Sequence, residues 1–355
     1  MSQVGSTTGG ISVSFDRYQF EGEDVSWVGE CPWNEGFCYG TESGKLLVPV
    51  KATPDDLEVY QLVDSGEAIN GVAFHRDDLA ASTREEVVIY PLPFSSNMTK
   101  RAKFDGGAHG VVACSKGGFV APLGSNGLLW MGANERGVFT TQTFITVGTE
   151  LDFYKIIRLG EFDQADHFVC AVRENGLLTL RLSDGDAIEG MGSIGFPGLD
   201  LVDVCGLRSP ERPFGVAGLG IDGTILLMHN VQEATRPQAL RLAATSGTPY
   251  TILCVDGHLL VLTSTALIFA PDLITRFLAG EPLSGGRSAR IFPMQAVDAY
   301  LVCDRLVLIL PDCVESMPID QLPRRNTASP SEMIREIIDP PWELSHPIEL
   351  TQVPA

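Results

Sequence analysis

Short apolar runs recur along this chain at a nearly constant spacing, and this repeat limits the possible folds more than any other feature. Each run is rich in Leu, Val and Ile and follows a turn-forming segment. Successive runs start about 43 residues apart, a period typical of propeller blades. Because the runs are short and bounded by turns, they predict strands rather than the long helices of helical repeats. The runs occupy residues 45–48, 87–90, 128–131, 177–180, 224–227, 266–269 and 306–309.

Four of these runs directly follow a glycine, namely Gly44, Gly127, Gly176 and Gly223. Each glycine is preceded by Ser, Asn or Asp, and such pairs form tight hairpin turns because glycine accepts a positive φ. These four glycines are therefore predicted to be structural turn residues of the repeat. In the other three repeats the equivalent positions hold Glu86, Thr265 and Arg305, so we expect those turns to be built differently.

Each repeat contains the same predicted order of strands. An inner strand rich in small residues comes first, as at residues 69–74, and a second strand follows, as at 79–82. The run after the turn forms the third strand, and a more polar outer strand closes the unit, as at 58–62. Seven such units predict an all-β fold, a seven-bladed β-propeller of four-stranded antiparallel blades.

A propeller must close its ring, because an unpaired terminal blade would expose sheet edges. Residues 11–20 alternate between apolar and polar, as a strand does. We expect this segment to supply the outer strand of the last blade, which we assign to residues 287–311. The competing donor of that strand is the segment 314–319.

The run Val72-Ala73-Phe74 and the run from Gly127 to Trp130 resemble the WD-repeat family of propellers. The resemblance extends over about residues 20–315 and is degenerate, since the chain has no Trp-Asp dipeptide. It implies the propeller architecture. Because that family consists chiefly of interaction scaffolds, it also implies a non-catalytic scaffold or adaptor within a multi-protein assembly.

The sequence divides into a short flexible N-terminus (1–10), the propeller (11–318) and a proline-rich C-terminal extension (319–355). Within the extension, Ser329-Pro330 followed by Glu332 has the pattern of a helix start. The pair Pro340-Pro341 would end that helix. We therefore expect one short helix over about residues 330–338.

The end of the extension carries four large apolar residues on a chain that prolines keep extended. Such a strip is an aggregation risk unless it is covered. Two alternatives stay open: the strip docks on the propeller of the same chain, or it docks on a partner protein. The residues are Trp342, Leu344, Ile348 and Leu350.

The charge balance narrows the choice of partners. Lys and Arg number 25 against 45 acidic residues, which gives a net charge of −20. An acidic surface repels phosphate backbones and anionic membranes, so the expected partners are other proteins, including those with basic patches. No stretch is long and apolar enough for a membrane span, and the N-terminus lacks a secretory signal pattern, so the expected location is the cytoplasm.

No motif predicts a catalytic residue, a metal site or a cofactor. The eight cysteines include no Cys-x-x-Cys pair, and neither a phosphate-binding loop nor a nucleophile elbow is present. The alternative to a scaffold is a lactonase-like propeller hydrolase with a divalent cation in the central channel. Its candidate ligands, which lie in or near the inner strands, are Asp24, Asn70, Asp203 and Asp298.

Overall fold

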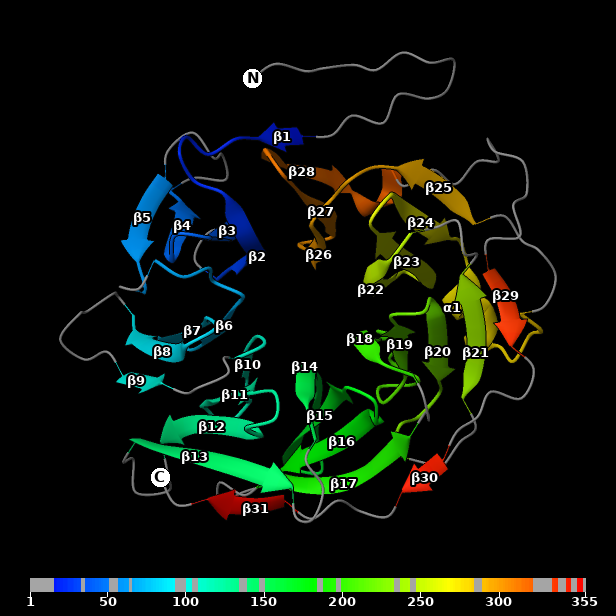
Figure 1. The fold of residues 1–355 in the computed structure, drawn as a ribbon, viewed down its shortest axis with the longest axis horizontal. Coiled ribbons are helices and arrows are strands. Elements are labelled where there is room, and N and C mark those ends of the chain that lie inside the picture. Colours follow the sequence, from blue (N-terminus) through cyan, green and yellow to red (C-terminus); the bar gives the residue numbers. More distant parts are fainter. Residues whose placement is uncertain are drawn as a thin grey trace.

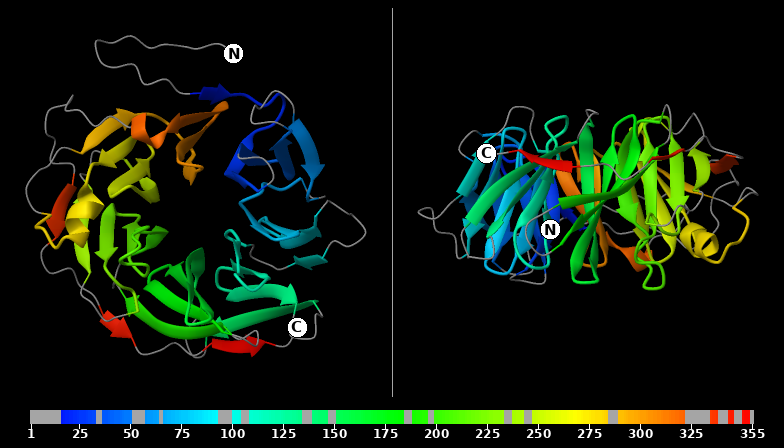
Figure 2. Two further views of the ribbon diagram at one scale, coloured as in Figure 1. Left: turned by 180° about the vertical axis from the view of Figure 1, so that it is seen from behind. Right: turned by 90° about the horizontal axis from the view of Figure 1, so that it is seen from below.

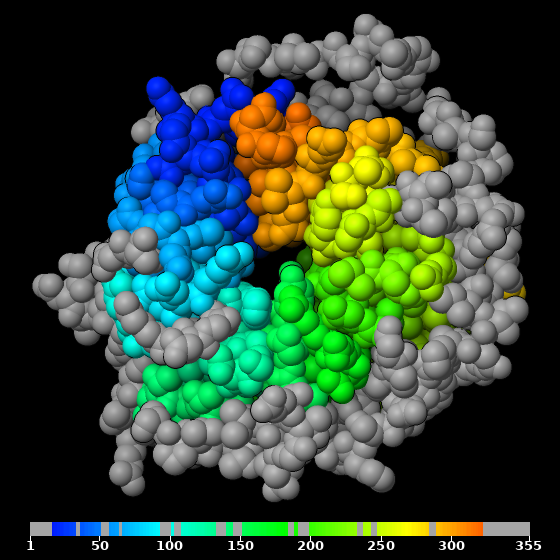
Figure 3. All heavy atoms as spheres, in the orientation of Figure 1, coloured from blue at the N-terminus to red at the C-terminus, as the bar shows by residue number. Residues whose placement is uncertain are grey.

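The computed structural model is a closed ring of seven antiparallel sheets around a central channel (Figure 1). A space-filling view shows the opening at the centre of this ring (Figure 3). The structure describes residues 16–32, 36–50, 57–63, 66–92, 100–103, 108–133, 139–146, 151–183, 188–195, 199–232, 237–242, 247–283, 289–321, 334–337, 343–345 and 350–353.

Each blade starts with its inner strand at the channel and proceeds outward through antiparallel neighbours. Blade 1 contains β2 (Val25–Cys31), β3 (Gly36–Thr41), β4 (Lys45–Pro49) and β5 (Leu57–Gln61). Blade 2 contains β6 (Gly71–His75), β7 (Asp78–Ser82), β8 (Glu86–Pro91) and β9 (Lys100–Lys103). Blade 3 contains β10 (Val112–Ala113), β11 (Phe119–Pro122), β12 (Leu128–Ala133) and β13 (Phe139–Thr146).

The next three blades repeat this order. Blade 4 contains β14 (Phe153–Phe162), β15 (Ala165–Val172), β16 (Gly176–Leu182) and β17 (Ile188–Gly195). Blade 5 contains β18 (Leu201–Gly206), β19 (Val216–Gly220), β20 (Thr224–Met228) and β21 (Gln238–Leu242). Blade 6 contains β22 (Pro249–Val255), β23 (His258–Thr263), β24 (Ala266–Ala270) and β25 (Arg290–Pro293).

Blade 7 joins the two ends of the propeller. It contains β26 (Asp298–Val302), β27 (Arg305–Leu310), β28 (Cys313–Pro318) and, as its outer strand, β1 (Asp16–Tyr18) from the start of the chain. The N-terminal segment therefore closes the ring, as predicted. The predicted extent of blade 7, residues 287–311, was wrong, because residues 290–293 form the outer strand of blade 6. The segment 314–319, which was the competing candidate for the outer strand, largely forms the third strand of blade 7.

The seventh repeat was thus misaligned by one strand. The run at 306–309 belongs to β27, which is the second strand of its blade and not the third. The misalignment arose because blade 7 is the one blade whose outer strand comes from the other end of the chain. The last two apolar runs of blade 7, in β27 and β28, are therefore its second and third strands.

The core lies between the blades. Seven apolar clusters are present in the described residues, and each joins two neighbouring blades. Strands in the middle of a blade are therefore covered on both faces, and β15, β20 and β24 are buried along their whole length. This explains why the repeat was visible as continuous apolar runs rather than as an alternating pattern.

The turns between the second and third strands differ as the sequence suggests. Gly44, Gly127, Gly176 and Gly223 have φ values of 79°, 95°, 92° and 84°. In blades 2 and 6 a threonine side chain stabilises the turn instead. The hydroxyl of Thr83 accepts from the backbone N–H of Glu86 at 3.2 Å, and the hydroxyl of Thr263 accepts from Ala266 at 3.1 Å.

Three described strands of the C-terminal extension lie on the rim of the ring, and each adds a fifth strand to one of three successive blades (Figure 2). Strand β29 (Ile334–Ile337) pairs with β21 of blade 5, β30 (Glu343–Ser345) with β17 of blade 4, and β31 (Leu350–Val353) with β13 of blade 3. The predicted helix over residues 330–338 is therefore wrong at 334–337, and its other positions lie outside the described residues. Two β-branched isoleucines and the open edge of β21 favour a strand there over the local helix signals.

Two short helices occur in the described residues, α1 (Leu273–Leu278) after β24 and a 3-10 turn at Ile319–Gln321. The side chains of Ile274 and Phe277 are buried against the cluster between blades 5 and 6. In the described part of the chain, no helix has both the length and the apolar character needed to cross a membrane.

Candidate binding sites at the ends of the channel

A polar pocket of about 290 Å³ lies at the end of the channel where the inner strands begin. Three of the four candidate channel residues, Asn70, Asp203 and Asp298, line it. Asp24 does not, because it lines a separate pocket of about 260 Å³ between blades 1 and 7. The other residues that line the polar pocket are His109, Tyr154, Lys155, Val202, Tyr250, Thr251 and Val297.

The polar side chains near this end of the channel connect each inner strand to the next blade. Ser26 donates to the carbonyl of Ile69 at 2.7 Å, linking blades 1 and 2. Asn70 donates to the carbonyl of Ala108 at 2.5 Å, linking blades 2 and 3. Asp203 accepts from the backbone N–H of Ile252, linking blades 5 and 6. Thr251 donates to Asp298, linking blades 6 and 7.

The Asp203 carboxylate is buried, and protein groups engage both of its oxygens. It accepts the backbone N–H of Val204 on Oδ1 and that of Ile252 on Oδ2, each at 2.9 Å, and Lys155 Nζ of blade 4 lies 3.4 Å from Oδ1. Burial raises the pKa of Asp203, although Lys155 acts in the opposite direction. The Asp203 carboxylate in turn raises the pKa of Lys155, which favours the charged form of the lysine.

Both carboxylate oxygens of Asp298 also accept hydrogen bonds from protein groups. Its Oδ1 accepts from the Thr251 hydroxyl and from the Ala299 N–H, both at 2.7 Å. Its Oδ2 accepts from the Tyr300 hydroxyl, also at 2.7 Å, and burial raises the pKa of this tyrosine. The Thr251 contact links blades 6 and 7, and the three contacts together occupy both oxygens of the carboxylate.

This geometry does not favour the hydrolase hypothesis. A cation at the polar pocket would compete with Lys155 for Asp203 and with three hydrogen-bond donors for Asp298. Within the described residues no group of three His, Cys, Asp or Glu side chains could hold a metal ion. Asn70, Lys155, Asp203, Thr251 and Asp298 of this pocket act as ties between blades.

Sequence reasoning missed Tyr154, Lys155 and Tyr250. Their positions arise from irregularities near the start of β14 and β22, where one residue is left out of the strand register. The irregularity places Tyr154 and Tyr250 at the pocket, and the guanidinium of Arg173 lies 4.4 Å from the ring centre of Tyr154. Aligning the first residues of the inner strands would have indicated these positions, since β18 has the same irregularity beside Asp203.

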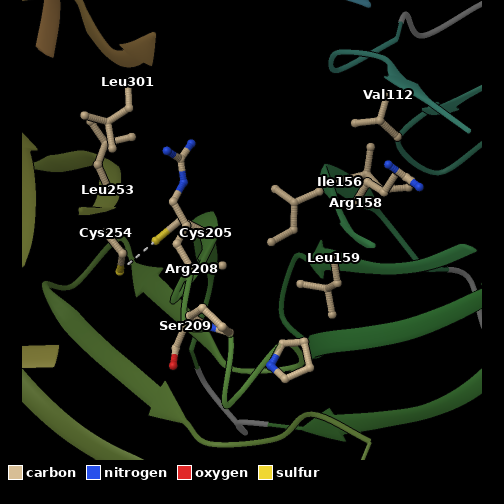
Figure 4. A pocket seen from close by; sticks show the side chains of 14 residues that line it. Val112, Ile156, Arg158, Leu159, Cys205, Arg208, Ser209, Leu253, Cys254 and Leu301 are labelled. Carbon is tan, nitrogen blue, oxygen red and sulfur yellow. Dashed lines mark hydrogen bonds between the residues drawn. The ribbon is translucent and has the colours of Figure 1, made fainter. Parts of the chain in front are cut away.

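A second pocket, of about 520 Å³, lies farther along the channel toward the end where the inner strands finish (Figure 4). Ile156, Leu159, Leu253 and Leu301 contribute apolar walls. The thiols of Cys205 and Cys254 also line it, with their sulfurs 3.2 Å apart. Arg158 and Arg208 bring positive charge to its rim, and Arg158 Nε donates to Asp166 Oδ1 at 2.6 Å.

One loop of blade 5 shapes this second pocket. The connection between β18 and β19 spans residues 207–215, whereas the equivalent turn in blade 6 has two residues, Asp256 and Gly257. The loop is closed by backbone hydrogen bonds from Arg212 to Ser209 and from Leu207 to Gly215. It places Arg208, Pro210 and Pro213 on the pocket, a feature that the blade itself does not require.

Acids predominate among the exposed charged residues on both faces of the ring, within the described turns. On the face where the inner strands begin, the described turns and the segments that enter the inner strands carry exposed acids but few exposed bases, Arg84 and Arg173. On the opposite face, acids also outnumber bases among the exposed residues of the described turns and connections: the acids are Asp77, Asp163, Glu211, Asp256, Asp272, Glu281, Asp304 and Asp320, and the bases are Arg76, Lys116, Arg208 and Arg212. We call the first surface the acidic face; its exposed acids are Glu21, Asp24, Glu42, Glu85, Glu174, Asp222 and Asp312.

The tail residues singled out in the sequence fall partly within the described strands. Leu344 lies opposite Ile194 of blade 4, and Leu350 lies opposite Thr146 of blade 3, so their backbone pairs with the propeller of the same chain. Trp342 and Ile348 lie outside the described residues. The backbone pairing favours docking in cis, while a docking role for the four side chains stays a prediction.

The fold defines the chain as a seven-bladed β-propeller, as the repeat predicted. No known family matches the sequence, and neither does any curated protein. Among solved structures, the β-propeller domain of Cps50 (Swd1) from Myceliophteria thermophila is similar, with a TM-score of 0.58 and 10% identity. The match covers 84% of this chain and 98% of that domain, and at this identity it shows the fold alone.

Proposed function

We propose that this propeller is a non-catalytic scaffold that holds other proteins within an assembly, and that its acidic face binds a partner with a basic patch. The observation that carries the proposal is the set of exposed acids around the start of the inner strands. These acids come from turns of blades 1, 2, 4, 5 and 7, with Arg84 and Arg173 as the exposed bases among them, so they form a broad negative field rather than a single site. Such a field steers and orients a basic partner.

The state of the channel residues supports binding over catalysis. The acids that a hydrolase would use, Asp203 and Asp298, are engaged in ties between blades. A closed ring stabilised by apolar clusters between all neighbouring blades offers rigid surfaces, which lowers the entropic cost of docking. The similar solved propeller is compatible with this role because propellers commonly serve as scaffolds.

The test compares capture of proteins from the native source by three forms of the full chain. The acidic-face variant carries Asp24→Lys, Glu42→Lys and Glu85→Lys. The control variant carries Asp77→Lys, Glu161→Lys and Glu211→Lys, which change the net charge equally at the opposite face. We expect at least one basic protein to be retained by the wild type and the control but lost by the acidic-face variant.

Two results would count against the proposal. If the chain is recovered alone under gentle conditions, the scaffold role loses its support. If both variants lose the same proteins equally, net charge rather than the acidic face governs binding. The melting temperature of each variant must match that of the wild type, so that a loss of capture reports on the surface.

A further inference from the structure

Two cysteines from neighbouring blades meet in the wall of the larger channel pocket. Cys205 lies in the inner strand of blade 5 and Cys254 in that of blade 6, and their sulfurs are 3.2 Å apart (Figure 4). Cys254 is buried, whereas Cys205 is half-buried and open to the pocket. The remaining six cysteines belong to blades 1, 3, 4 and 7.

The register of the two inner strands holds this pair in place. Asp203 lies two residues before Cys205 and accepts a hydrogen bond from Ile252, which lies two residues before Cys254. Side chains two residues apart in a strand point to the same face. The hydrogen bond between Asp203 and Ile252 therefore fixes the alignment of the two inner strands at which the two thiols face each other. Apolar side chains of both blades surround the thiols.

We propose that Cys205 and Cys254 form a redox-active dithiol, which a low-molecular-weight disulfide converts into a disulfide between blades 5 and 6. An S–S bond is about 2.05 Å long, so the sulfurs must approach by roughly 1 Å, which side-chain rotation within a packed pair of strands supplies. The pocket gives a small oxidant access to Cys205, and no other cysteine lies in these two blades.

The reaction balances in two exchange steps. The thiolate of Cys205 attacks one sulfur of the small disulfide, which forms a mixed disulfide and releases one small thiol. The thiolate of Cys254 then attacks the sulfur of Cys205, which closes the bond between blades and releases the second small thiol. The protein loses two protons and two electrons, and the small disulfide gains both. The hydrogen bond with Cys254 and burial raise the pKa of Cys205, so the first step is slow near neutral pH.

The test uses the folded full chain and 2-hydroxyethyl disulfide as the oxidant. After incubation, free thiols are alkylated in denaturant and the chain is digested with trypsin without reduction. Cleavage after Arg and Lys gives peptides 182–208 and 242–276, which contain Cys205 and Cys254 as their only cysteines. We expect these two peptides to become linked, with a mass two hydrogens below their sum, and to separate again after reduction.

Three controls make the outcome decisive. The exposed thiol of Cys303, alone in peptide 291–305, reports that the oxidant is active. The variant Cys303→Ser should still form the link, and Cys205→Ser should not. The inference is overturned if Cys303 is modified while Cys205 and Cys254 are both recovered alkylated. It is equally overturned if Cys205 stays as a mixed disulfide beside an alkylated Cys254.

Discussion

The carboxylate of Asp203 in blade 5 accepts the backbone N–H of Ile252 in blade 6 at 2.9 Å, across the boundary between two sheets. Backbone groups at the start of an inner strand lie beside the channel, where no further strand can pair with them. A side chain from the neighbouring blade fills this role. The same solution recurs where Ser26 bonds to Ile69 and Asn70 bonds to Ala108.

Removing the Asp203 carboxylate should destabilise the ring. Asp203→Ala leaves the N–H groups of Val204 and Ile252 without their acceptor and Lys155 without its counter-ion. We expect a loss of about 1–3 kcal/mol in the free energy of unfolding. Urea unfolding monitored by fluorescence measures this loss.

Two matched variants test the physical reason. Asp203→Asn keeps one carbonyl oxygen as an acceptor, so its loss should be smaller than that of the alanine variant. Glu211→Ala removes an exposed acid on the opposite face and should change stability by less than about 0.5 kcal/mol. Equal stability of Asp203→Ala and the wild type would show that the tie is dispensable.

The sequence predicted the architecture well because the repeat reflects the core directly. Runs such as 87–90 and 225–227 are apolar throughout because blades cover both of their faces. Three of the four candidate ligands of the hydrolase hypothesis, Asn70, Asp203 and Asp298, lie in one pocket, since equivalent positions of a ring converge on its axis. Asp24 does not join them, because it lies before the register irregularity of β2 and remains between blades 1 and 7.

Other features could not be predicted because they depend on the closed ring. The strand at Ile334–Ile337 pairs with the edge of β21, a partner nearly a hundred residues earlier in the chain, and local helix signals carry no information about that edge. The meeting of Cys205 and Cys254 likewise depends on the register between two sheets. Sequence spacing places both in inner strands but does not set that register.

Acid should remove a contribution of Glu23 to stability. Hydrogen bonds from Lys45 and then Ser43, the latter at 2.5 Å, lower the pKa of Glu23. A lowered pKa in the folded state means that the stabilisation is fully present above the unfolded pKa of about 4.3 and is lost as the pH falls through the folded value.

The measurement compares urea unfolding of the wild type and Glu23→Gln from about pH 6 to about pH 3. The wild type should be more stable at the upper end, and the difference between the two proteins should shrink as the pH falls. A difference that stays constant over this range would mean that the charge of Glu23 does not contribute.

Stepwise truncation of the C-terminal extension should lower stability stepwise. Ending the chain after residue 346 removes β31, ending it after 338 also removes β30, and ending it after 321 removes all three tail strands. Each step leaves the edge of one more blade unpaired. We expect the free energy of unfolding to fall by about 0.5–1.5 kcal/mol per lost hydrogen bond. Thermal unfolding measures the loss, and dye binding measures any apolar surface that is exposed.

The same series separates docking in cis from docking in trans. If the tail docks on its own propeller, the melting temperature falls with each step. If Trp342, Leu344, Ile348 and Leu350 serve a partner instead, the shortest chain keeps its melting temperature but loses a captured protein. A shortest chain that keeps both would show the extension to be passive.

A methyl group at Gly71 should separate blades 2 and 3. Gly71 lies in the inner strand β6, and a Cβ there would lie 2.8 Å from Gly110 Cα and 2.9 Å from Val111 N of the next blade. These are backbone atoms and cannot rotate away, so the blades must shift. We expect Gly71→Ala to lower the free energy of unfolding by about 1–3 kcal/mol, as overpacking of a closed core does.

The control is Gly206→Ala in the inner strand β18, where the nearest atom to a Cβ is Leu159 Cδ2 at 3.9 Å. Because alanine restricts the unfolded chain more than glycine, this control should be neutral or gain up to about 1 kcal/mol. Equal unfolding free energies of the two variants would show that the close approach of blades 2 and 3 does not limit this position.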